Sequence, residues 1–137
     1  MSTPAALTRP VPPGTIGRRF VARLAVLAAR ALAVLPPRRL RTVLAVLRRG
    51  ARPAGYAEAK AARDLVIAVS LRCLGPRGCL PRALATVLLC RLAGTWPTWC
   101  VGVRVAPPFG AHSWVEADGL LVDEPMPEGY LARLFTV

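Results

Sequence analysis

Apolar residues recur at helical spacing through the first half of the chain. The stretch "GRRFVARLAVLAARALAVL" places arginines on one stripe of a helix and apolar residues on another. The arginines are Arg19, Arg23 and Arg30, and the apolar residues are Phe20, Leu24, Leu27 and Ala31. Pro36 and Pro37 end this helix, because the residue before a proline avoids the helical region. A second helix, "RRLRTVLAVLRRG", ends at Gly50, and a third extends from Tyr56 to roughly Leu71.

The pattern changes in the second half. The stretch "RGCLPRALATVLLC" predicts a helix that is apolar on most faces and therefore central, with Cys79 at its start. The stretches "TWCVGVRV" and "AHSWVEADGLLVDEP" are rich in β-branched and aromatic residues and predict strands, the second folded as a hairpin. Helices followed by an antiparallel sheet indicate an α+β fold.

The chain is long enough for one domain with a real core. The beginning, "MSTPAALTRPVPPG", holds four prolines, so residues 1 to 16 are expected to form a flexible arm. We expect residues 17 to 137 to form a single domain. Within it, residues 17 to 70 are a basic helical part and residues 71 to 137 carry the functional core.

The net charge of +12 is unevenly distributed. Residues 1 to 57 hold eleven arginines and no acidic residue, whereas five of the seven acidic residues lie after residue 115. This asymmetry suggests an acidic partner for the first half. The basic stretches lack interleaved aromatic residues and any recognised binding motif, which argues against nucleic acid. A membrane-surface role for the basic stripe is the weaker alternative.

The arginines also bear on where the protein acts. Arg23 and Arg30 interrupt the first apolar run, so neither a membrane span nor a secretory signal is expected. A cytoplasmic location would keep the four cysteines as thiols. Their spacing matches no zinc pattern, and we expect neither a metal nor a cofactor.

Cys79 is the first candidate for chemistry. Gly78 permits an abrupt turn into the helix, and Pro81 is tolerated in a first turn, where N–H groups lack partners. A thiol at the positive end of a helix has a lowered pKa. Helix placement alone is weak evidence, because buried and inert cysteines are common.

His112, the only histidine, lies on the first strand of the hairpin. A two-residue turn at Asp118-Gly119 would make Asp123 its diagonal neighbour, whereas a three-residue turn with a glycine bulge would place Glu124 directly opposite. Either arrangement assembles a nucleophile, a base and an orienting carboxylate.

Two further residues complete the candidate site. Arg82, one turn into the Cys79 helix, is a candidate for holding a substrate carbonyl or acidic side chain, although such arginines often pair locally. Trp114 shares the face of His112 and would shield the Cys–His pair or simply pack in the core.

The stretches "GCLPRALATVLLCRL", "VGVR", "PPFGAHSWVEADG" and "LVDEP" resemble the B2 proteins of lasso-peptide biosynthesis, within the transglutaminase-like superfamily of cysteine peptidases. The resemblance covers residues 63 to 137. It implies a transglutaminase- or papain-like core and a leader peptidase that cleaves a ribosomally made precursor peptide. It also implies a separate leader-recognition protein (B1 type) and a cyclase as partners.

The resemblance assigns Cys79 as nucleophile and His112 as base. The family acid stands twelve residues after the histidine, which is Glu124 here, and Asp123 is the fallback. The same triad would serve a domain that transfers an acyl group to an amine or only binds, so these functions stay open.

Overall fold

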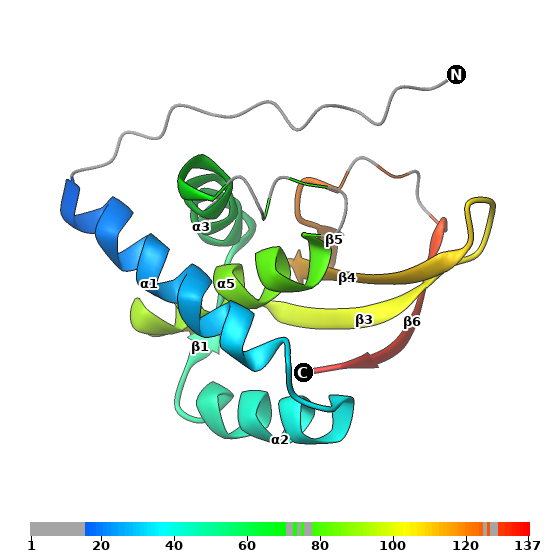
Figure 1. Ribbon diagram of the computed structural model, residues 1–137, viewed down its shortest axis with the longest axis horizontal. Helices are drawn as coiled ribbons and strands as arrows, with labels where there is room; N and C mark the ends of the chain where they lie inside the picture. Colours follow the sequence, from blue (N-terminus) through cyan, green and yellow to red (C-terminus); the bar gives the residue numbers. More distant parts are fainter. Residues whose placement is uncertain (1–15, 71–72, 74, 76–77, 125, 127–128) are drawn as a thin grey trace.

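The computed structural model describes residues 16–70, 73, 75, 78–124, 126 and 129–137. The α+β fold is confirmed: helices occupy one side and a small antiparallel sheet the other (Figure 1). In chain order the elements are α1 (Ile16–Leu32), α2 (Pro37–Arg48), β1 (Arg52–Pro53), α3 (Tyr56–Val69), α5 (Cys79–Leu92), β2 (Thr95–Trp96), β3 (Thr98–Arg104), β4 (Gly110–Ala117), β5 (Leu120–Leu121) and β6 (Leu131–Thr136).

The main sheet has the strand order β5-β4-β3-β6, with every neighbouring pair antiparallel. Strands β3, β4 and β5 lie in the stretches that the sequence pattern predicts as strands, and β3 and β4 pair from Thr98–Glu116 to Arg104–Gly110. Strand β6 and the short parallel pair of β1 and β2 were not predicted. Their residues lack strong alternation, and pairing with distant segments creates these strands.

Helix α5 is central, as its sequence predicts. It packs against α1, α3 and β4, and its buried side chains include Leu84 and Val87, both 0% exposed. Trp99 and Val115, which face each other across β3 and β4, join the same hydrophobic core. This packing fixes where α5 begins relative to β4.

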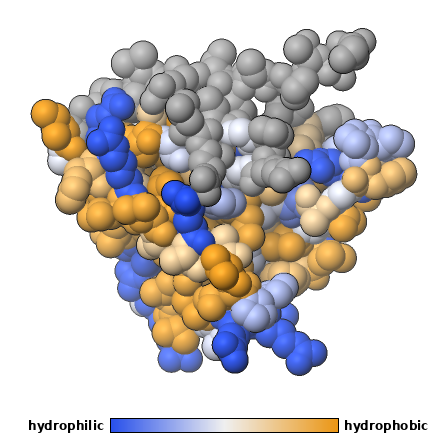
Figure 2. Space-filling view, in the orientation of Figure 1, coloured by the Kyte–Doolittle hydropathy of each residue, from blue (hydrophilic) through white to orange (hydrophobic). Residues whose placement is uncertain are grey.

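Helix α1 turns its small residues inward. Its buried positions are Ala22, Ala25, Val26 and Ala29, and such small side chains let the helix approach α5 closely. The larger stripe faces solvent instead, with Phe20 60%, Leu24 49% and Leu27 59% exposed. Figure 2 shows hydrophobic patches beside long hydrophilic side chains where α1 crosses this face.

The hairpin between β4 and β5 closes with a two-residue turn. Leu121 pairs with Glu116 and Leu120 with Ala117, and both Asp118 and Gly119 have positive φ (54° and 74°). The alternative three-residue turn with a bulge is therefore wrong. The Asp118 carboxylate also accepts a hydrogen bond of 2.8 Å from the Tyr56 N–H at the start of α3.

The expected arm at residues 1 to 16 lies outside the described residues except for Ile16, which is already the first residue of α1. In the described part of the chain, no helix combines the length and apolar character that crossing a membrane requires.

Replacing Leu84 by alanine should lower the free energy of unfolding by about 2–5 kcal/mol, because the buried cavity would not refill. Leu92→Ala is the matched control on the same helix, since Leu92 is 70% exposed, and should cost no more than about 0.5 kcal/mol. Chemical denaturation of both variants measures the difference. Equal losses would contradict the central position of α5.

Candidate active site

Cys79 is the first residue of α5, directly after the N-cap Gly78. The turn into the helix needs no side-chain cap, and Pro81 lies within the first turn, where its missing N–H has no cost. The Cys79 side chain is half-buried. Its sulfur therefore lies at the positive end of the helix dipole while still open to a reactant.

His112 lies on β4 and faces Cys79. It is 4% exposed, and its side chain forms a hydrogen bond with the Cys79 thiol. Its Nε2 atom lies 3.2 Å from Oε2 of Glu124. With Glu124 at Nε2, the thiol proton would go to Nδ1, the ring nitrogen that also lies 3.5 Å from Nη2 of Arg104.

Glu124, not Asp123, contacts His112, although the turn that favoured Glu124 is not the one that forms. The pairing with β4 ends where the Val122 N–H bonds to the Val115 carbonyl. Asp123 then has a φ of 55°, which turns the chain out of the ladder. As a result the Glu124 side chain is 3% exposed against His112, while that of Asp123 is 44% exposed.

The pKa values of Cys79 and His112 shift toward each other, which is the direction that an ion pair requires. Burial alone would raise the pKa of the Cys79 thiol, but hydrogen bonds from His112 and the Ser113 backbone outweigh it and lower the pKa. Burial alone would lower the pKa of His112, but its hydrogen bonds to Cys79 and Glu124 outweigh it and raise the pKa. Both shifts act in the direction that stabilises a thiolate beside an imidazolium.

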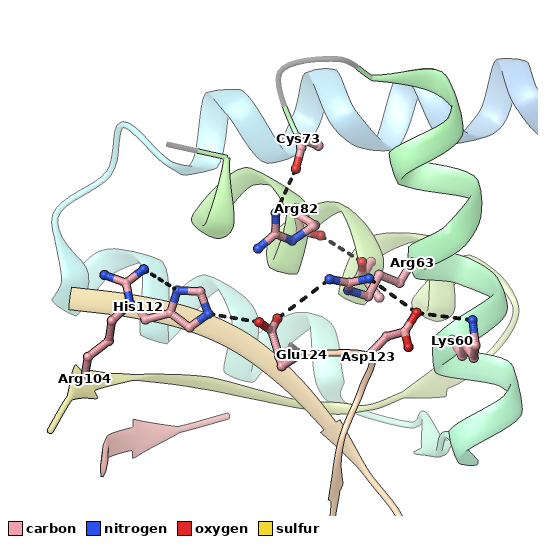
Figure 3. A network of polar contacts seen from close by, with 9 residues as sticks. Lys60, Arg63, Cys73, Arg82, Arg104, His112, Asp123 and Glu124 are labelled. Atoms are coloured by element: carbon pink, nitrogen blue, oxygen red, sulfur yellow. Dashed lines mark hydrogen bonds and ion pairs between the residues drawn. The ribbon is translucent and has the colours of Figure 1, made fainter. Parts of the chain in front are cut away.

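Two arginines at this site were not among the predicted site residues. Arg104 on β3 places Nη2 3.5 Å from Nδ1 of His112. Arg63 in α3 lies beside Glu124 and Asp123 (Figure 3). The position of Arg104, diagonal to His112 across β3 and β4, could have been read from the strand pairing. The contact of Arg63 could not, because it depends on how α3 packs.

Arg82 and Trp114 both lie at the site. The Arg82 side chain is buried, and its Nη1 donates a hydrogen bond of 2.9 Å to the Cys73 carbonyl, the local pairing that was one of its two interpretations. Its charge also helps to lower the pKa of Cys79. Trp114 stacks on the His112 ring at a centroid distance of 5.9 Å and is 1% exposed. It therefore covers one face of the imidazole.

The remaining cysteines are buried. Burial raises the pKa of Cys90 to about 11, and burial together with Glu116 raises that of Cys100 well above its ordinary value. Among the described residues, no group of three or more His, Cys, Asp and Glu side chains is arranged to hold a metal ion.

A sequence model of the transglutaminase-like superfamily matches residues 22–136. The chain belongs to this superfamily. The matched range includes most of α1, all of α2 and α3, and the three residues Cys79, His112 and Glu124. Transglutaminase-like proteins include cysteine-peptidase-like enzymes. No curated protein and no solved structure matches the chain with significance.

Iodoacetamide at about pH 6, where an ordinary thiol is almost fully protonated, should label Cys79 well before Cys73, Cys90 or Cys100. The lowered pKa of Cys79 and the raised pKa of His112 both increase the share of thiolate at this pH. His112→Ala should slow the labelling of Cys79, because the thiolate loses its cation. Mass spectrometry of the alkylated peptides gives the four rates. An accessible Cys79 that reacts no faster than a free thiol would contradict the ion pair.

Proposed function

We propose that this transglutaminase-like protein is a cysteine peptidase that removes the leader from a lasso-peptide precursor, as in the B2 proteins that it resembles. The observation that carries the proposal is the buried contact of His112 with Glu124 on one side and with Cys79 on the other. Such an arrangement supplies a nucleophile, a base and an orienting carboxylate.

The proposed reaction has two stages. The Cys79 thiolate attacks the carbonyl carbon of the leader–core bond, and the His112 imidazolium gives its proton to the leaving amine of the core peptide. Water, deprotonated by His112, then hydrolyses the thioester and releases the leader as a carboxylate. Glu124 keeps the ring oriented and stabilises the imidazolium in both stages.

The partners in this proposal are the precursor peptide, a separate leader-recognition protein of the B1 type and the cyclase that acts on the core. The arginine-rich helices support an acidic partner. Residues 16–57 of the described chain carry no acidic side chain, and α2 alone includes Arg38, Arg39, Arg41 and Arg48. We propose a cytoplasmic location, where Cys79 would stay reduced.

The test is cleavage of a precursor whose leader carries threonine next to last, with the leader-recognition protein present. Mass spectrometry should find two products whose masses sum to the precursor plus one water, and Cys79→Ala should abolish both. A precursor with that threonine replaced by alanine is the substrate control. Incorporation of an added amine in place of water would identify an acyl transferase instead. Absence of both reactions would contradict the enzyme proposal.

Glu124→Gln should lower kcat by about 100-fold or more, because the amide cannot stabilise the imidazolium. Asp123→Asn is the matched control one residue away. It should leave kcat within a few-fold of the wild type, since the Asp123 side chain is exposed and does not contact His112. Steady-state cleavage rates separate the two variants. A larger loss in Asp123→Asn would make Asp123 the working acid.

A further inference from the structure

Arg63 is a buried cation in the middle of α3, and its side chain is 4% exposed. Its guanidinium lies between two carboxylates: Nη1 is 3.7 Å from Oδ2 of Asp123, and Nη2 is 4.0 Å from Oε1 of Glu124 (Figure 3). The two arms of the guanidinium therefore connect the exposed acid to the buried one.

Burial of this cation is costly for the fold. A guanidinium stays protonated even where burial lowers its pKa, as it does for Arg63, so the charge must be offset inside the protein. The offset is incomplete, because Nη2 is buried without a hydrogen-bond partner among the described residues. An apolar side chain of similar size would serve packing at least as well. Stability alone therefore does not account for Arg63.

The position of the Glu124 carboxylate indicates the role of Arg63. One carboxylate oxygen, Oε2, faces Nε2 of His112, and the other, Oε1, faces Nη2 of Arg63. Both side chains of this acid–base contact are 3% exposed, so water contributes little to holding the carboxylate ionised or oriented. The cation on α3 lies where it can supply both effects.

We propose that Arg63 is a positioning residue of the site: it keeps Glu124 ionised and keeps its carboxylate turned toward His112. The inference rests on the proposed function only in taking Glu124 as the third member of the triad. Arg63 itself contacts neither the sulfur nor the proposed scissile bond.

Charged or titratable groups face His112, Glu124 and Arg63 from every element around them. These are Lys60 and Asp64 from α3, Cys79 and Arg82 from α5, Arg104 from β3, and Asp123 after β5. Removal of Arg63 has two opposite effects on the pKa of His112. Loss of a nearby cation by itself would raise the pKa of His112. Protonation or rotation of Glu124 would remove the anion beside His112 and lower its pKa.

The direction of that change tests the proposal. Since His112 is the only histidine of the chain, NMR titration of the untagged protein reports its pKa without ambiguity. The titration is made in a Cys79→Ala background, so that no thiol titrates with the ring. Arg63→Met should lower the pKa of His112 by about 1 unit or more. An unchanged or raised pKa would overturn the proposal.

Two controls isolate the route through Glu124. Lys60→Met removes the exposed cation of the same network, which contacts Asp64 and Asp123 but not Glu124, and should change the pKa of His112 little. In a Glu124→Gln background, Arg63→Met should no longer lower that pKa, because the carboxylate is already neutral. A fall of the same size there would overturn the proposal.

Folding is checked by thermal unfolding of each variant. If Arg63→Met alone does not fold, Arg63→Lys takes its place. Lysine keeps the positive charge but loses the two-armed geometry of the guanidinium, so the pKa of His112 should fall by less than about 1 unit. No fall at all would overturn the proposal. These outcomes do not depend on peptidase activity. An unreactive Cys79 in the wild type would contradict the proposed function but would not change the conclusion about Arg63.

Discussion

The contact between the start of α5 and the middle of β4 determines the rest of this structure. Strand β5 pairs with only Glu116 and Ala117, so the neighbouring part of β4 has no strand along that edge in the described chain. The Ser113 backbone is therefore free to bond to the Cys79 sulfur, and His112 reaches the same atom. A longer β5 would cover this edge and exclude the start of the helix.

The site groups charges that a stable core would avoid. The side chains of Arg63, His112 and Glu124 are all buried, and the Glu124 carboxylate lies between the other two. Removing one of them would leave a buried charge unpaired, which costs more than the group contributes while paired. Buried charges that shift the pKa values of neighbouring groups in this way are typical of functional sites.

The sequence predicted what depends on local rules. The long run that is apolar on most faces located α5, and the glycine before Cys79 indicated its start. The turn residues Ala117-Asp118-Gly119 indicated the hairpin. Contacts between segments that are distant in the chain could not be predicted from the sequence. The left-handed conformation of Asp123, which directs Glu124 to His112, follows from where the ladder ends. Burial of alanines rather than leucines in α1 depends on the space beside α5.

The carboxylate of Asp118 joins the hairpin tip to the first turn of α3. Helix α3 carries Arg63, and the chain leaving the hairpin carries Glu124 six residues beyond the tip. The positions of Arg63 and Glu124 therefore both depend on the hydrogen bond between Asp118 and Tyr56. Loop length at this turn is consequently under constraint: an insertion there would shift the helix and the returning strand relative to each other and disturb a buried pair that the loop never touches.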